Sequence, residues 1–212
     1  MKTHKLLALS IIFLMSNAAR GETPPARPTS EVLLEELNSA RMEPELYASY
    51  LRSHLDKFID EYTFEDIGLR IRTNEGKAAV LEAIAYLDAQ AAIGEPMTAS
   101  KGLTLAAKDH VLDLGPKGIT GHMSSDGLTT ASNRVSRYGT WVRTFGENIS
   151  FSSQKARGHV INLIVDDGVP SRGHRLSIYN AAFRKAGVAC GPHLIYKKMC
   201  VIEFAGDYRE IK

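Results

Sequence analysis

The order of its expected elements places this chain in the α+β class. Apolar residues recur every three or four positions through most of the sequence, which is the spacing of one face of a helix. Near the C-terminus two short β-prone runs flank Gly191-Pro192, as in an antiparallel hairpin. Helices that come first and strands that come last are typical of an α+β domain.

The individual elements follow from capping and breaking residues. Ser30 is a favourable N-cap for the first helix, and Pro44 suits the first position of a second helix. Gly94 and Pro96 end a third. The mixed, polar segment 60–74 is predicted to be a loop with short turns. The remaining expected elements are helices at 75–92, 102–114 and 154–167, a short strand at 147–151, and hairpin strands at 186–190 and 198–204.

The N-terminus has the three parts of a secretory signal. Lys2 and Lys5 precede an apolar run over residues 6–15, and small residues follow, with Ala18 or Gly21 as cleavage points. The run is about half the length that a membrane-spanning helix needs, so a retained anchor is the weaker interpretation. We expect a signal peptide over 1–21, a Pro-rich leader over 22–29 and one domain over 30–212. The mature protein should be secreted or periplasmic, without a stable membrane span.

Charge argues against a nucleic-acid partner. Without residues 1–21 the chain has 23 basic and 24 acidic residues, so it is close to neutral. No basic stripe remains to follow a phosphate backbone. We therefore expect a ligand or a protein surface as partner.

The two cysteines, Cys190 and Cys200, are predicted to form a disulfide. An even count in an exported protein favours a bridge, and both residues lie in β-type runs, where opposed positions reach bridging distance. The alternative is a pair of buried free thiols. Two cysteines without a matching His/Cys set do not make a structural zinc site.

Three residues stand out as candidates for chemistry: His122, Glu147 and His174. Each lies in a polar or Gly-flanked segment between periodic elements, where binding groups gather. Two imidazoles and a carboxylate can bind a divalent metal such as zinc with one position open, or act as general acid and base. The competing interpretation is that they are unrelated surface residues.

Six short motifs occur in the order found in the CAP superfamily (cysteine-rich secretory proteins, antigen 5, pathogenesis-related 1), also called the SCP domain. The chain resembles this family over most of residues 30–207. The motifs are Leu37-Asn38-Ser39-Ala40-Arg41, Leu103 to His110, Gly121-His122, Gly146-Glu147-Asn148-Ile149-Ser150, Gly173-His174-Arg175, and the pair Gly187-Val188-Ala189-Cys190 with Cys200-Val201-Ile202-Glu203-Phe204.

The resemblance implies a three-layer α-β-α sandwich with a central antiparallel sheet and a cleft of two His and two Glu. His122, His174 and Glu147 match three of those positions. The second Glu of the family precedes the second His, where this chain has Asp166 and Asp167 and lacks the usual Trp. Either Asp could substitute; we favour the interpretation that both are surface acids at a helix end. The segment 56–97 exceeds the compact family pattern.

The function expected from these features is an exported binding or interaction module. Its His/Glu cleft would hold a divalent metal, most simply zinc bound weakly by His122, Glu147 and His174, or a lipid-like ligand such as a sterol. The alternative is a metal-assisted, protease-like hydrolase that uses the same cleft. Outside the cleft, His110 is expected to be structural, His159 to lie on a solvated helix face, and His193 to lie in the hairpin loop.

Overall fold

A computed structural model describes residues 29–66, 68–152 and 155–211 of the chain. The predicted signal peptide and nearly all of the leader lie outside these residues. At the centre is a four-stranded sheet in the order β3-β5-β6-β4, in which β5, β6 and β4 are antiparallel and β3 is parallel to β5. The strands span Thr98–Ala99 (β3), Gly139–Phe151 (β4), Lys185–His193 (β5) and Lys197–Glu210 (β6).

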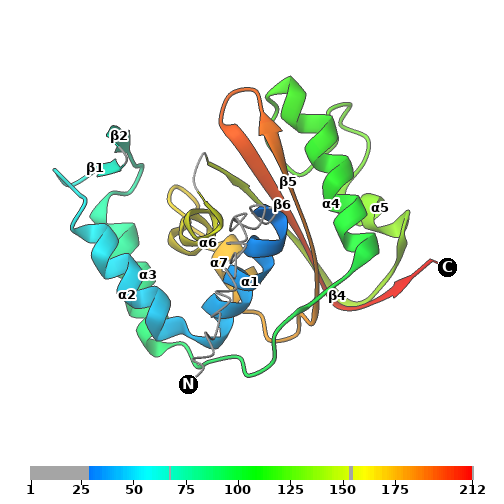
Figure 1. The fold of residues 1–212 in the computed structure, drawn as a ribbon, viewed down its shortest axis with the longest axis horizontal. Helices are drawn as coiled ribbons and strands as arrows, with labels where there is room; N and C mark the ends of the chain where they lie inside the picture. Colours follow the sequence, from blue (N-terminus) through cyan, green and yellow to red (C-terminus); the bar gives the residue numbers. More distant parts are fainter. Residues whose placement is uncertain (1–28, 67, 153–154, 212) are drawn as a thin grey trace, which may run out of the picture.

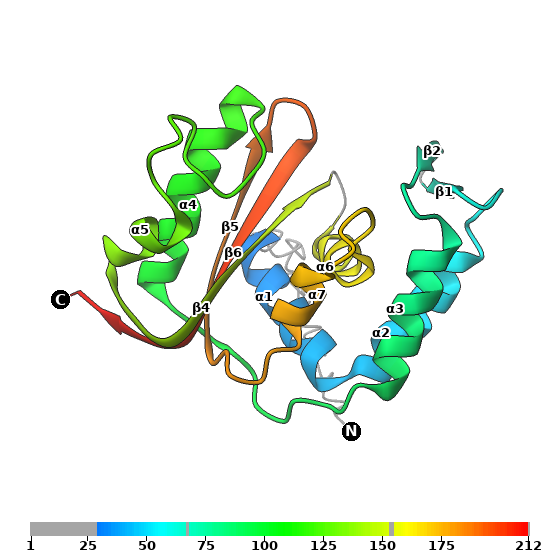
Figure 2. The same ribbon diagram turned by 180° about the vertical axis from the view of Figure 1, so that it is seen from behind.

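Helices cover both faces of this sheet, as Figures 1 and 2 show. On one face lie α4 (Lys101–Leu114) and α5 (Ala131–Ser136), next to the 3-10 turn η1 (Gly115–Lys117). The other face carries α1 (Thr29–Met42), α6 (Ala156–Val165) and α7 (Gly173–Ile178). The α+β class and the α-β-α sandwich are thus confirmed.

A helical arm extends beyond this second layer. It consists of α2 (Pro44–Leu55) and α3 (Lys77–Ala89), which lie side by side and carry the small sheet of β1 (Thr63–Asp66) and β2 (Leu69–Arg72) at their end. The prediction of a loop over 60–74 is therefore wrong. The strands escape sequence analysis because only Phe64 is buried, so they lack an apolar period.

Two differences in the main sheet have clear physical causes. Strand β4 begins well before residue 147, but a register shift between Val142 and Phe145 hides its alternation. Gly191-Pro192 lies inside β5 rather than in the turn. In the described residues β3 pairs only with Lys185 and Ala186 of β5, so Pro192 lies on a free edge where its missing N–H costs no ladder bond.

The core forms on both faces of the sheet. The larger part packs α1, α2, α3 and α6 against β5 and β6, with fully buried Leu33, Leu37 and Ile202. A smaller part packs α4 against the other face through Leu114 and Val201. Among the described residues no helix is both long enough and apolar enough to cross a membrane.

A charged side chain, Arg41, ties α1 to the segment after α7. It is fully buried, and its guanidinium donates hydrogen bonds to the carbonyl oxygens of Ile178 at 2.6 Å, Asn180 at 3.0 Å and Phe183 at 3.0 Å. Burial, with the nearby charge of Arg184, lowers the pKa of Arg41 to about 10, which leaves it charged at neutral pH. Arg41 therefore holds in place the main chain from Ile178, the last residue of the helix that carries His174, to Phe183.

The predicted disulfide between Cys190 and Cys200 is confirmed. The two residues are direct partners in the β5–β6 ladder, with Cα atoms 4.1 Å apart. Cys200 is fully buried and Cys190 partly exposed, so the bridge joins the core to the free edge of the sheet. It closes a short loop.

Removing this bridge by Cys190→Ala/Cys200→Ala should lower the free energy of unfolding by about 2–3 kcal/mol, because the unfolded chain regains the entropy of a loop of about ten residues. Urea unfolding with and without reductant measures the loss. Reductant should shift the wild type and leave the double variant unchanged; an equal response of both proteins would contradict this expectation.

Candidate functional site

Strand β4 lies at one edge of the main sheet, and its neighbouring residues Glu147 and Asn148 point to opposite faces. On one face, Glu147 Oε1 lies 2.7 Å from His122 Nδ1, in the loop between η1 and α5. On the other face, Asn148 Nδ2 donates to the main-chain oxygen of His174, in α7, at 2.9 Å. Two consecutive residues of one strand thus hold the two histidine segments from different layers.

Glu147 is almost fully buried and is paired at both oxygens. His122 Nδ1 engages Oε1, and Arg134 of α5 makes a buried ion pair with Oε2. Arg134 also donates to the main-chain oxygen of His122 at 3.0 Å. Burial alone would raise the pKa of Glu147, but the bond from His122 and the charge of Arg134 outweigh it, so this pKa is lowered. Glu147 is therefore a carboxylate at neutral pH.

A second carboxyl group, Glu203 on β6, lies directly across the ladder from Glu147. It is fully buried, and Arg134 Nη2 is 3.9 Å from its Oε1, beyond hydrogen-bond distance. Burial and the negative charge of Glu147 raise the pKa of Glu203 well above its usual range. The pair is therefore one carboxylate and one neutral acid, with one arginine beside them.

The acid near the second histidine is Asp166. It is the C-cap of α6, has a positive φ of 56°, and is buried, so its expected place among surface acids is wrong. Its oxygens accept from His174 Nδ1 at 2.6 Å and from the His174 main-chain N–H at 2.9 Å. The left-handed cap turns this side chain back toward α7, which helical spacing alone does not reveal. Asp167 instead binds the main-chain N–H groups of Asn74 and Glu75.

The imidazoles of His122 and His174 face each other. Their ring centroids are 6.5 Å apart and their planes differ by 24°. Because a carboxylate only accepts hydrogen bonds, each Nδ1 must carry the proton, which leaves Nε2 with a lone pair. No described residue bonds to either Nε2. The His122 side chain is 55% exposed and that of His174 24%, so solvent reaches both.

This donor set fits a metal ion held by two imidazoles, each of which is oriented by a carboxylate hydrogen-bonded to its Nδ1. It fits less well a metal site that is fully coordinated by protein side chains. The described residues contain no group of three or more His, Cys, Asp or Glu arranged around one ion. Both oxygens of Glu147 are already bonded to protein groups. Any ion here would keep positions open for water or for a ligand.

Sequence analysis missed Arg134 and Glu203. Glu203 had a signal: it stands between Ile202 and Phe204 in an apolar strand, where an acid needs a special reason. Arg134 had none, because an Arg on a short helix is ordinarily solvated. Here the Thr130–Asn133 capping box starts α5 and directs Arg134 inward.

Three further histidines of the described residues, His110, His159 and His193, have structural roles. His110 is structural, as expected: it is fully buried, and its Nε2 lies 2.8 Å from the oxygen of Gly121, which places the loop that carries His122. His159 is also fully buried, so its expected position on a solvated face is wrong. Its ring bridges Ser150 and Cys200, and burial lowers its pKa to about 4. His193 ends β5 and is buried rather than in the turn.

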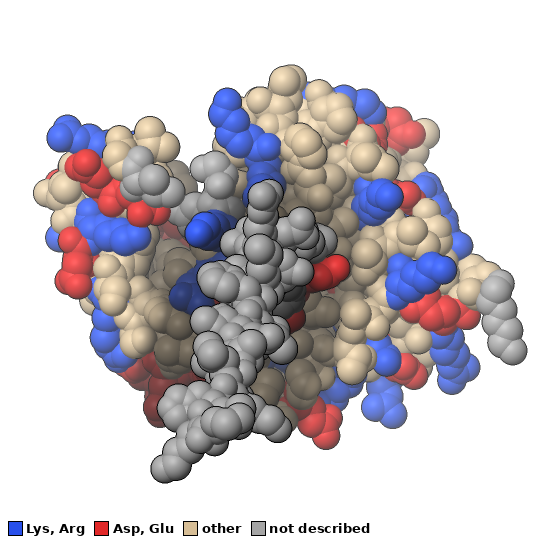
Figure 3. Space-filling model, in the orientation of Figure 1, with Lys and Arg blue, Asp and Glu red and all other residues tan. Residues whose placement is uncertain are grey.

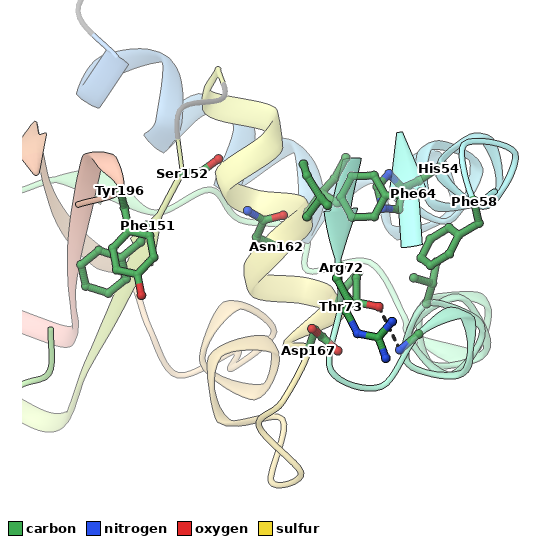
Figure 4. A pocket seen from close by; sticks show the side chains of 15 residues that line it. His54, Phe58, Phe64, Arg72, Thr73, Phe151, Ser152, Asn162, Asp167 and Tyr196 are labelled. Carbon is green, nitrogen blue, oxygen red and sulfur yellow. Dashed lines mark hydrogen bonds between the residues drawn. The ribbon is translucent and has the colours of Figure 1, made fainter. Parts of the chain in front are cut away.

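A cavity of about 430 Å³ lies apart from His122 and His174, between the helical arm and the β4 and α6 side of the body. In Figure 4 the rings of His54, Phe58 and Phe64 form one side, Phe151 and Tyr196 lie opposite, and Asn162 and Asp167 stand between them. The long segment 56–97 supplies much of its wall.

The comparison with family models assigns this α-β-α sandwich to a known family. The cysteine-rich secretory protein family (CAP) matches residues 34–201. The chain belongs to this family, as its motifs indicate. A comparison with curated proteins gives no match.

Two solved structures show partial similarity. An outer surface protein from Borrelia burgdorferi is 20% identical, with a TM-score of 0.43 over 51% of this chain and 76% of that protein. An extracellular SCP-domain protein from Bacillus anthracis is 19% identical, with a TM-score of 0.41 over 61% of this chain and 39% of that protein.

Proposed function

We propose that this protein is an extracytoplasmic binding module whose cleft holds a divalent transition metal, most simply zinc, through Nε2 of His122 and of His174. The signal-like N-terminus supports export. Glu147 and Asp166 orient the two rings, and Arg134 and Glu203 support Glu147. When bound, the metal supplies a positive centre to which an anionic or carbonyl oxygen of a ligand can bind.

The observation that carries this proposal is the pairing of each Nδ1 with a buried carboxylate, at 2.7 Å for His122 and 2.6 Å for His174. Such pairing fixes the tautomer and makes Nε2 a better metal ligand. A pair of unrelated surface histidines would not need two buried acids. In this proposal Glu147 orients His122, and its direct ligation of the metal stays a prediction.

Binding is favoured over hydrolysis by the contacts of Ser124, the first residue with a hydroxyl after His122 in the sequence. Ser124 follows His122 in sequence, but its Oγ donates to Asp126 and accepts from the Thr129 N–H, not from an imidazole. An activated nucleophile needs a base within hydrogen-bond reach. A metal-activated water remains the route for the hydrolase alternative, and a lipid-like ligand is the alternative occupant without metal.

Zinc titration by calorimetry at neutral pH tests the proposal. Wild type should bind about one zinc ion weakly, and His174→Ala should abolish the heat of binding because one of two protein ligands is lost. Asp166→Asn should weaken binding by about 10–100-fold, since the ring of His174 loses its carboxylate anchor.

His54→Ala, in the helical arm, is the matched control and should bind zinc as the wild type does. Absence of heat with the wild type would overturn the metal proposal and leave the cleft to an organic ligand. Equal binding by wild type and His174→Ala would show that zinc binds elsewhere. Measuring ester and peptide hydrolysis with and without zinc then separates a binding module from the hydrolase alternative.

A further inference from the structure

The turn between β5 and β6 exposes large apolar side chains. Leu194 is 70% exposed, Ile195 63% and Tyr196 48%. Hairpin turns are ordinarily polar, because nothing covers their side chains. Three consecutive apolar residues at such a tip call for a functional reason.

The patch continues onto the neighbouring end of α4. The Leu194 N–H donates to the Gly115 oxygen at 3.0 Å, and the side chain of Ile195 lies against Gly118. Leu112, on α4, is 62% exposed, and Ile119 is also exposed. We call Leu112, Pro116, Ile119, Leu194, Ile195 and Tyr196 the apolar tip. Beside it is a mainly apolar depression of about 520 Å³, lined by Val111, Leu112, Pro192 and Leu194.

Basic residues border the apolar tip. Lys108 lines the depression, and Lys197 and Lys198 follow the tip directly in β6. No ion pair among the described residues engages these three lysines. Lys117 also lies there and is paired with Asp113 at 2.6 Å. Figure 3 shows this end of the molecule, uppermost in the view, as mainly uncharged surface with basic and some acidic side chains at its margin.

We propose that the apolar tip docks on an anionic lipid bilayer, with Leu194, Ile195 and Leu112 entering the interface and the lysines contacting the headgroups. The combination of exposed apolar residues and a basic border is what an interfacial membrane contact requires. Tyr196, the amphipathic member of the apolar tip, suits the headgroup level.

Charge complementarity favours an anionic lipid bilayer as the partner of the apolar tip. A protein partner would bury the patch in a groove of its own, and a second copy of this chain would bring the same lysines together, which is unfavourable. An anionic lipid surface satisfies the lysines and the apolar side chains at once. The docking surface lies outside the histidine cleft, so it does not depend on the metal.

Co-sedimentation of the exported protein with lipid vesicles tests this proposal. The wild type should partition onto phosphatidylcholine vesicles that contain phosphatidylglycerol, and much less onto pure phosphatidylcholine. Leu194→Ser/Ile195→Ser should remove most of the binding. Lys108→Glu/Lys197→Glu should weaken it by about tenfold or more, and added salt should do the same in the wild type.

Leu69→Ser, an equally exposed leucine at 61% in the helical arm, is the matched control and should bind as the wild type does. All variants replace exposed side chains, so thermal unfolding should be nearly unchanged and a folding defect can be recognised. No partition onto anionic vesicles would overturn the proposal. A dimer in gel filtration that Leu194→Ser/Ile195→Ser dissociates would also overturn it and assign the tip to a second copy of the chain.

Discussion

Arg41→Met should lower the free energy of unfolding by about 3–5 kcal/mol. The guanidinium is fully buried and supplies donors to three main-chain oxygens at the end of α7 and just after it. Methionine fills much of the volume but donates nothing, so these buried carbonyls lose their partner. A buried acceptor without a donor costs its full desolvation penalty, which is larger than the net value of an ordinary hydrogen bond.

Urea unfolding followed by circular dichroism measures this loss. Arg52→Met is the matched control: Arg52 is exposed and pairs with Asp88 on the surface, so its replacement should cost less than about 1 kcal/mol. A loss for Arg41→Met no larger than that for Arg52→Met would show that water or the surrounding chain replaces the missing donors.

Arg41 also shows what a sequence can reveal about this fold. The spacing of Leu33, Leu37 and Ala40 predicts the inward face of the first helix, and the spacing of four residues from Leu37 places Arg41 beside them. Local periodicity therefore locates the buried arginine. Its partners lie about 140 residues later in the chain, and no local pattern announces such a contact.

At the cleft, too, local sequence patterns reveal which residues matter but not which distant residues they contact. His122, Glu147 and His174 could be named because each stands in a short motif, and the order of the motifs is specific to the family. The role of Asp166 depends on a left-handed cap, which only the three-dimensional path of the chain defines. Glu203 could have been noticed as an acid in an apolar strand, but its pairing with Glu147 depends on the β4–β6 register.

The dependence on distant contacts also explains why the sequence analysis missed β1 and β2 and the start of β4. Strands β1 and β2 are four residues each and bury one side chain between them, so neither shows a period. Strand β4 has a register shift that breaks its alternation. In both places tertiary contacts, rather than local preference, decide the conformation.

Arg134→Met should destabilise the protein at neutral pH by about 3–5 kcal/mol, because it removes one partner of a buried ion pair. Glu147 would remain buried as a carboxylate, with only His122 and the neutral Glu203 beside it. Its pKa, lowered in the wild type, should rise once the charge of Arg134 is gone. The variant should therefore lose least at low pH, where Glu147 can be protonated.

Glu203→Gln should show the opposite pH dependence: its stability relative to the wild type should rise, not fall, as pH increases. Burial and the charge of Glu147 keep Glu203 protonated in the folded state, whereas the unfolded chain releases this proton above the ordinary pKa of Glu. The folded state then binds more protons than the unfolded state, so this group makes wild-type stability fall as pH rises above about 4.5. Gln has no proton to hold and removes that dependence.

Urea unfolding from about pH 5 to about pH 8 should show the variant gaining stability relative to wild type as pH rises. A constant difference between the two proteins over that range would mean that Glu203 is ionised in the fold, and that Arg134 balances two carboxylates rather than one.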